Sequence, residues 1–169
     1  MITLKNILVA TDFGNTAASA LAYGRELARQ YQGRLHVFHA VDDLQWRYSL
    51  DMSPGLLVGI QDDLEESARQ HMTGLLTDED RGQLHAIGVV SALCPDPAAS
   101  IVEYARSAAI DVIVIGTHGR RGVSRLLLGS VAERVVRTAP CPVLTIHPHE
   151  HEFITPDALA AVAKVQPCA

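Results

Sequence analysis

Short apolar runs alternate with segments of helical periodicity along most of the 169-residue chain. Each run has the length of a typical strand, whereas the segments between them are long enough for helices. We therefore predict strands over 6–11, 35–41, 84–91, 112–115 and 143–146. Strands that alternate with helices form a parallel sheet with right-handed crossovers. The sequence thus predicts an α/β fold: a single domain with a five-stranded parallel sheet flanked by helices, in a Rossmann-like arrangement.

The runs 6–11 and 112–115 are the most uniformly apolar. Strands that are apolar on both faces are typical of the interior of a parallel sheet, so we expect these two at its centre. Ligands of such sheets lie beyond the carboxyl ends of the strands, where the strand order reverses. Asp12 and Gly116 follow the two runs directly and are candidate ligand contacts. A simpler role for Asp12, capping the next helix, stays open.

Two helices are predicted between the first three strands. The first covers 16–32, and Gly33 is placed to end it. A loop is expected over 42–55, and a second helix follows it. The residues expected on the buried face of this second helix recur at helical spacing, and they are Leu57, Ile60, Leu64, Ala68, His71 and Leu75.

The later helices carry start signals. Asp96 is placed to cap a third helix, with Pro97 at its first position. Ser130 and Glu133 have the spacing of a capping box, which predicts that a fourth helix begins at Ser130. Both starts follow strands, as a parallel sheet with crossover helices requires.

The segment 116–131 links the strand 112–115 to this fourth helix, and its glycines and arginines are Gly116, Gly119, Gly122, Gly129, Arg120, Arg121 and Arg125. Glycines let backbone N–H groups approach a ligand closely, and a helix N-terminus attracts anions. The segment therefore suits a phosphate group. The alternative is that the glycines only serve turn geometry and that the arginines are solvated.

Several classes of protein are excluded. The sequence has no Gly-x-x-x-x-Gly-Lys-Ser/Thr motif, and the turn after the first strand lacks Gly-x-Gly-x-x-Gly, which argues against a dinucleotide oxidoreductase. The net charge is −5 and no basic stripe is present, so we expect no nucleic-acid partner. The apolar run 7–10 is too short for a membrane span or a signal peptide, so we expect no membrane partner.

The cysteines and histidines predict no metal centre. The three cysteines, Cys94, Cys141 and Cys168, form no Cys-x-x-Cys pair, which fits reduced thiols and a cytoplasmic protein. His36 and His39 on the second strand are expected to serve packing or surface roles. The cluster His147, His149 and His151 is expected to bind metal only adventitiously.

The spacing Gly116-x-x-Gly119, nine residues, then Gly129-Ser130 resembles the signature of the nucleotide-binding branch of the universal stress protein family. The stretches 6–12 and 141–146 are similar to the family's first and last strands. The resemblance covers about 4–147, so we predict a universal stress protein domain over 1–147. The tail 148–169 lies outside it, with a predicted short helix over 157–165.

The resemblance implies an adenine nucleotide alpha hydrolase-like fold and a set of ligand contacts. Next to the base and ribose it implies Ala10, Thr11, Asp12 and Val41. Next to the ribose and phosphates it implies Gly116, His118 and Gly119, with Gly129, Ser130 and Val131 on the phosphate chain. It further implies ATP (or AMP or ADP) accompanied by Mg²⁺, and a homodimer that pairs the strands Val143–Ile146.

Two positions depart from the family pattern. Ala10 stands where some nucleotide-binding relatives have proline, which leaves the wall of the site smaller. Cys94 stands where relatives commonly carry glycine, and a thiol there is expected to narrow the site.

The resemblance implies an ATP-binding sensor or regulator of the stress response. We see no convincing general base and no second metal carboxylate, so no catalytic residue is assigned and slow ATP hydrolysis stays open. One alternative is a weak nucleotide hydrolase in which His118 or Asp12 positions a water. Another is a dimerisation module that binds no nucleotide. The sequence does not identify the stress, the protein partner or the physiological nucleotide.

Overall fold

The computed structural model describes residues 1–44, 54–117 and 129–147. The predicted boundary between the domain 1–147 and the tail 148–169 coincides with the last described residue. The tail and the short helix predicted over 157–165 therefore lie outside the described residues.

The predicted strands form one parallel sheet. They are β1 (Asn6–Ala10), β2 (Arg34–Asp42), β3 (Ile87–Cys94), β4 (Val112–Gly116) and β5 (Val143–Ile146). Their order across the sheet is β3-β2-β1-β4-β5, with every neighbouring pair parallel. The prediction that the first and fourth strands lie at the centre is confirmed: β1 is the middle strand and β4 is beside it. The α/β fold class is confirmed as well.

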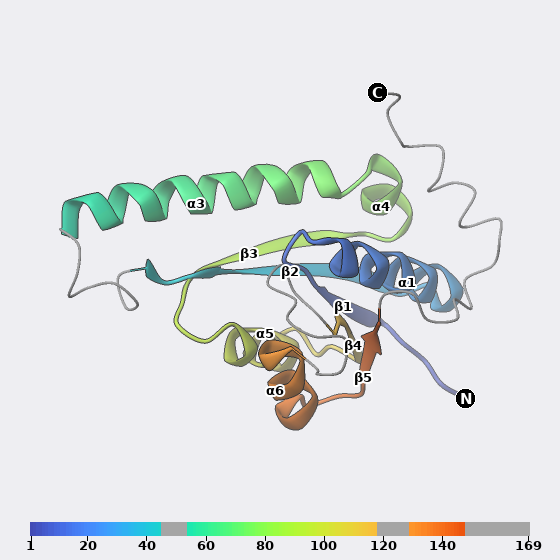
Figure 1. Cartoon of the computed structure of the whole chain (residues 1–169). Helices are drawn as coiled ribbons and strands as arrows, with labels where there is room; N and C mark the ends of the chain where they lie inside the picture. Colours follow the sequence, from blue (N-terminus) through green and yellow to red (C-terminus); the bar gives the residue numbers. More distant parts are fainter. Residues whose placement is uncertain (45–53, 118–128, 148–169) are drawn as a thin grey trace.

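Helices cover both faces of the sheet (Figure 1). They are α1 (Asn15–Tyr31), α3 (Pro54–Leu75), α4 (Asp78–Gln83), α5 (Pro97–Ser107) and α6 (Ser130–Thr138). Side chains alternate between the faces of a strand. Ile7 and Val9 of β1 accordingly pack under α1 and α3, whereas Leu8 and Ala10 pack against α5 and α6. The middle of the sheet is thus buried by two separate apolar clusters.

The buried face of α3 differs from the prediction. Leu57 and Ala68 are buried as expected, but Leu64 is 42% exposed and His71 is exposed. The other buried positions lie one residue away from the predicted stripe, at Gln61, Met72 and Leu76. The reason is Gly88 on β3, where an added Cβ would lie 2.6 Å from Cγ of Met72. The missing side chain of Gly88 makes room for Met72 and so fixes the rotation of the helix.

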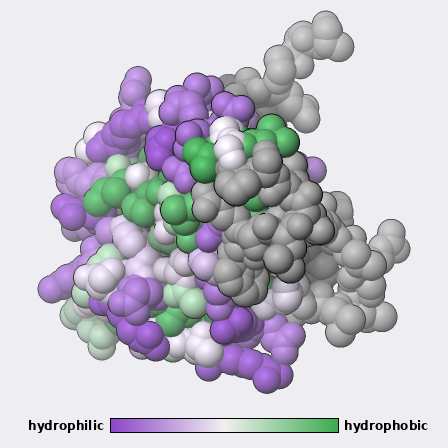
Figure 2. Space-filling model, turned by 90° about the vertical axis from the view of Figure 1, so that its left-hand side faces the viewer, coloured by the Kyte–Doolittle hydropathy of each residue, from purple (hydrophilic) through white to green (hydrophobic). Residues whose placement is uncertain are grey.

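The outer surface at the start of α3 includes exposed apolar side chains. Leu56 is 55% exposed and Val58 is 44% exposed, and Leu93 at the end of β3 is 50% exposed. Figure 2 shows apolar patches among hydrophilic surface on this end of the molecule. The sequence also predicts a solvated acidic face near the start of α3, made of Asp62, Asp63, Glu65 and Glu66. Asp62, Asp63 and Glu66 are exposed, but the side chain of Glu65 is only 14% exposed.

The third strand begins later than predicted, because residues 78–83 form the short helix α4, which the sequence analysis missed. Thr77 caps α4 in a reciprocal box with Asp80. Arg25 of α1 donates two hydrogen bonds to Asp80, from Nε to Oδ1 at 2.9 Å and from Nη2 to Oδ2 at 2.7 Å. Burial of Asp80 acts to raise the pKa of its carboxyl, but hydrogen bonds from Arg25 and Thr77 outweigh it and the pKa is lowered. Arg25 and Asp80 thus fix α4 to α1.

The amino ends of the two central strands are joined by one carboxylate. Oδ2 of Asp111, just before β4, accepts hydrogen bonds from the backbone N–H groups of Lys5 at 2.6 Å and Asn6 at 2.9 Å. The Asn6 side chain donates to the carbonyl of Ala109 at 3.2 Å. The carboxyl ends of the strands, at the opposite edge, carry the candidate site.

His36 has a packing role, as predicted. Its side chain is buried between β2 and α5, and Nδ1 lies 2.8 Å from the hydroxyl of Tyr104. Nε2 has no hydrogen-bond partner among the described residues. Protonation would place a second buried N–H donor there without an acceptor. Burial, followed by the nearby charge of Arg34, lowers the pKa of His36.

His36 therefore makes the stability depend on pH. Since its pKa in the folded state is below the unfolded value of about 6.5, stability is full above that pH and falls as the pH drops below it. We expect a loss of up to about 1.4 kcal/mol per pH unit in that window. Urea unfolding at pH 7 and pH 5.5 should show this loss in the unaltered protein and a smaller one in His36→Phe. His85 is exposed, so His85→Asn is the matched control. Equal losses of stability in all three proteins would contradict the assignment of the pH dependence to His36.

Candidate functional site

The candidate site lies at the carboxyl edge of the sheet, between β1 and β4. Ala10 pairs with Ile115 in the last shared register of the two strands, so Thr11 and Gly116 are the next residues on each side. The chain leaves β1 toward α1 on one face, and α6 after β4 lies on the other face. The strand order reverses at this point, which is where parallel sheets of this kind open a crevice. Ala10, Thr11, Asp12 and Gly116 are brought together as predicted.

The turn from β1 to α1 is closed by two side chains. Oγ1 of Thr11 accepts a hydrogen bond from the N–H of Phe13 at 3.0 Å, and Oδ1 of Asp12 accepts one from the N–H of Gly14 at 2.9 Å. The N-cap of α1 is Gly14. Asp12 therefore does not cap α1 as the alternative reading supposed. It closes the turn and keeps its carboxylate at the edge of the sheet.

Phe13 lies in this turn with a φ of 62°, a left-handed conformation that is uncommon for a residue other than glycine. Its ring centroid lies 4.3 Å from that of His39 and 5.4 Å from that of His71. Nδ1 of His39 donates to the carbonyl of Thr11 at 2.8 Å. The sequence analysis missed this ring cluster, because it depends on contacts between three separate elements.

The ring cluster borders a groove of about 540 Å³ between α1 and α3, lined by Thr11, Phe13, Gly14, Ala17, Leu21 and His71 among others. A second hollow, of about 450 Å³, lies between residues 1–3 and the last turns of α1. None of the described residues predicted to contact the ligand lines that second hollow. Of the same described residues, Thr11 alone lines the groove, so the groove adjoins the candidate site at the turn after β1.

Val41 lies next to the last residue of β2, and Cys94 is the last residue of β3. Phe38 is the partner of Ala10, so Val41 stands three residues beyond the end of β1, where its side chain is buried. The Cys94 thiol is 2% exposed and donates to Ser91, with its sulfur 3.2 Å from Oγ. It is thus engaged within its own strand.

α6 begins at Ser130 as predicted, but its cap differs from the prediction. Gly129, not Ser130, is the N-cap, and its carbonyl accepts the N–H of Glu133 at 2.9 Å. The predicted capping box between Ser130 and Glu133 is therefore wrong. Glycine has no side chain to cap the helix, and the carboxylate of Glu133 pairs instead with Arg137 at 2.9 Å. As a result no side chain of the described residues caps the first turn of α6, and Ser130 is exposed.

Two backbone hydrogen bonds fix this N-terminus at the end of β4. The N–H of Gly129 donates to the carbonyl of Thr117 at 2.7 Å, and the N–H of Thr117 donates to the carbonyl of Ile146 at 2.9 Å. Gly129 and Ser130 therefore lie at the same edge as Gly116. His118 and Gly119 lie outside the described residues, as do Arg120, Arg121, Gly122 and Arg125.

The described glycines of the signature are explained differently. At Gly116 an added Cβ would lie 2.8 Å from Cγ2 of Thr16, so this glycine is required by the packing of α1 on β4. Gly129 has a φ of −59° and a ψ of 147°, which any residue adopts. Turn geometry therefore does not account for glycine at position 129.

The profile of the Universal stress protein family matches residues 3–147. The chain belongs to the universal stress protein family. Universal stress protein MJ0531 of Methanocaldococcus jannaschii is 32% identical to it over 152 residues, which cover 84% of this chain and 81% of the relative. The match over nearly the whole described chain assigns the family.

Solved structures of the family share the fold. A protein of the universal stress protein family from Burkholderia pseudomallei has a TM-score of 0.65 and 31% identity, covering 85% of this chain and 96% of the other. The universal stress protein from Archaeoglobus fulgidus, solved in complex with dAMP, has a TM-score of 0.55 and 21% identity, covering 86% and 99%. The second likeness shows the fold alone.

The described part of this universal stress protein has neither a metal cluster nor a membrane-spanning helix. Within residues 1–44, 54–117 and 129–147, no three His, Cys, Asp or Glu side chains are grouped so that they could hold a metal ion. His149 and His151 of the predicted histidine cluster lie outside those ranges. No described helix combines the length and apolarity needed to cross a membrane.

Proposed function

We propose that this universal stress protein binds an adenine nucleotide, ATP, at the carboxyl edge between β1 and β4. The observation that carries the proposal is the N-terminus of α6. No side chain of the described residues caps it, and Gly129 has a backbone conformation that does not require glycine. Uncapped N–H groups at a helix N-terminus favour a phosphate, and the lack of a Cβ lets it approach. The residues present therefore fit a phosphate chain.

The remaining contacts are those that the resemblance to the family implies. Gly129, Ser130 and Val131 bind the phosphates through backbone N–H groups and the exposed Ser130 hydroxyl, and His118 and Gly119 bind between the phosphates and the ribose. Ala10, Thr11, Asp12 and Gly116 line the crevice beside the base and ribose, and Val41 stands at its rim. Mg²⁺ accompanies ATP and neutralises part of its charge.

We further propose that the protein acts in the cytoplasm as a sensor or regulator of the stress response. The bound nucleotide biases its conformation or its choice of partner. It forms a homodimer in which Val143–Ile146 of two copies pair, since β5 has a neighbour in the sheet on one side only, and exposed edge strands favour pairing. Sedimentation analysis is expected to give twice the mass of the chain, and a monomer at every concentration would contradict this part.

The proposal is tested with the full chain. Isothermal titration with ATP and Mg²⁺ is expected to show one nucleotide per chain. Mass spectrometry of gently purified protein is expected to release an adenine nucleotide. If neither measurement detects a nucleotide, the site assignment fails and the dimerisation module without a ligand is favoured.

A further inference from the structure

Arg134 lies four residues after Ser130, at the start of the second turn of α6. Residues four apart share a face of a helix, and side chains tilt toward the N-terminus of their helix. Arg134 is therefore directed back along the face that carries Ser130, over a rise of about 6 Å that its long side chain can span.

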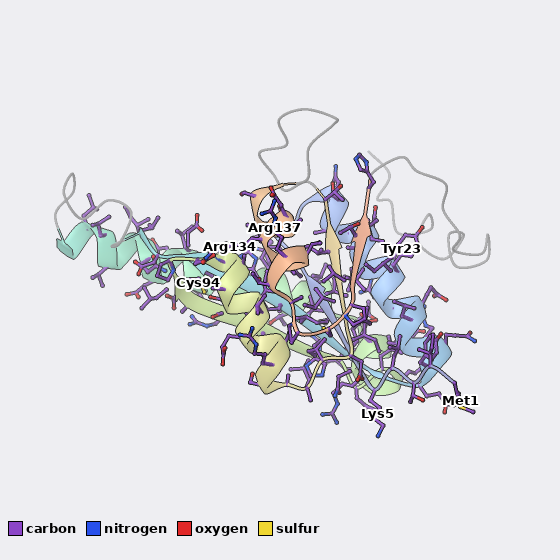
Figure 3. The ribbon with its side chains drawn as sticks, turned by 90° about the horizontal axis from the view of Figure 1, so that it is seen from below. Met1, Lys5, Tyr23, Cys94, Arg134 and Arg137 are labelled. Carbon is purple, nitrogen blue, oxygen red and sulfur yellow. The ribbon has the colours of Figure 1, made fainter. Side chains whose placement is uncertain are left out.

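The guanidinium of Arg134 is held in place by Asp96. Nη2 of Arg134 lies 2.7 Å from Oδ2 of Asp96, while the other carboxylate oxygen of Asp96 caps α5 by accepting the N–H of Ala99 at 3.3 Å. Asp96 comes two residues after the end of β3, so it lies at the carboxyl edge of the sheet. Figure 3 labels Arg134 and Arg137 on α6 and Cys94 at the end of β3. The ion pair thus keeps one guanidinium at the edge that carries the candidate site.

Arg134 retains the capacity to bind an anion. Its side chain is 62% exposed, and the ion pair with Asp96 uses one of its nitrogens. A guanidinium has five N–H donors in a planar fork that matches phosphate oxygens. An exposed ion pair of this kind contributes little to stability, so a purely structural role explains little of its placement.

We propose that Arg134 binds the phosphate chain of the nucleotide and selects ligands with two or more phosphates over monophosphates. The inference rests on the proposed function and specifies its ligand class. The backbone N–H groups at the start of α6 suffice for one phosphate. A second or third phosphate needs another cation, and Arg134 supplies it. Asp96 is the partner of Arg134 without a ligand, and it competes with the phosphate chain for the guanidinium.

The same helix offers a matched control. Arg137 is also an exposed arginine and pairs with Glu133 at 2.9 Å. It lies about one further turn from the N-terminus of α6, out of reach of a phosphate bound there. Arg137→Ala therefore removes an arginine and an ion pair from α6 without removing the proposed contact.

The experiment measures the affinities of ATP and AMP, with Mg²⁺, for the full chain and four variants. Removing a charge-assisted hydrogen bond predicts that Arg134→Ala weakens ATP about 10- to 100-fold and AMP less than about threefold. Arg134→Lys should recover part of the loss, since it keeps the charge without the fork. Arg137→Ala should leave both affinities unchanged. Asp96→Asn should leave ATP binding unchanged or tighter, because asparagine still caps α5 while Arg134 is released.

The outcomes distinguish two roles of Arg134: contact with the ligand, or an ion pair that only joins α5 to α6. If Asp96→Asn weakens ATP as much as Arg134→Ala does, the ion pair only joins α5 to α6 and the inference is overturned. Equal losses for ATP and AMP, or no loss for either, also overturn it while leaving the proposed function intact. Failure of the unaltered protein to bind either nucleotide overturns the proposed function, and this inference with it.

Discussion

Arg25→Ala is expected to lower the free energy of unfolding by about 3–5 kcal/mol, the cost of leaving a buried charge without its partner. Asp80 is 1% exposed, and Arg25 donates to both of its carboxylate oxygens. Arg25 also donates to the carbonyl of Leu75 at 3.0 Å, so the variant loses the connection to the end of α3 as well. Urea unfolding at pH 7 measures the effect.

The neighbouring Arg29 provides the control. It pairs with Glu26 and Glu79, which are exposed, and Arg29→Ala is expected to cost less than about 1 kcal/mol. If Arg25→Ala loses no more stability than Arg29→Ala, other groups stabilise the buried carboxylate of Asp80 when Arg25 is absent.

The same ion pair predicts a dependence on acid. The pKa of Asp80 is lowered in the folded state, so its contribution to stability is present above the unfolded pKa of about 3.9. It is lost as the pH falls through the lower, folded pKa. In Arg25→Ala the hydrogen bonds from Arg25 are gone, while the burial of Asp80 and its hydrogen bonds with Thr77 remain. The acid-dependent stabilisation should therefore shrink, which unfolding measured between pH 5 and pH 3 can check.

Gly129→Val is expected to weaken ATP binding about 100-fold or more, equivalent to at least about 2.8 kcal/mol. The φ of −59° and ψ of 147° at this position suit valine, so the fold is expected to persist while the side chain occupies the approach to the first turn of α6. Isothermal titration gives the affinity, and thermal unfolding shows whether the structure is retained.

Substitutions of two other glycines serve as controls for Gly129→Val. Gly59 in α3 has open space around it, so Gly59→Ala should leave binding unchanged. Gly116→Ala should lower stability, because its Cβ would press on Thr16. Normal ATP binding by Gly129→Val would refute the assignment of the phosphate site to this helix.

The sequence predicted the sheet well because its strands are apolar on both faces and are separated by clear helix signals. Asp96 caps α5 as predicted, and β5 has the predicted bounds. The errors arise where tertiary contacts decide the local structure. The rotation of α3 depends on the space above Gly88, and α4 is a short polar helix fixed by Arg25 and Asp80.

The candidate site was predicted in outline, with its details set by backbone geometry that no pattern reveals. The ends of β1 and β4 come together as expected, but the left-handed turn at Phe13 and the contact of its ring with His39 have no signal in the sequence. The start of α6 was placed correctly at Ser130, whereas the cap proved to be Gly129. The difference matters, because it leaves the helix N-terminus open.

The pairing of the central strand has a consequence for how the chain folds. On one side Ile7 of β1 pairs with Leu35 of β2, which follows soon in the sequence. On the other side it pairs with Val112 of β4, and the nearby hydrogen bond from Asn6 to Asp111 joins residues 105 positions apart. During synthesis the middle of the sheet therefore stays half-formed until residue 116 has emerged from the ribosome. Such long-range pairing slows folding and leaves apolar strand edges exposed meanwhile.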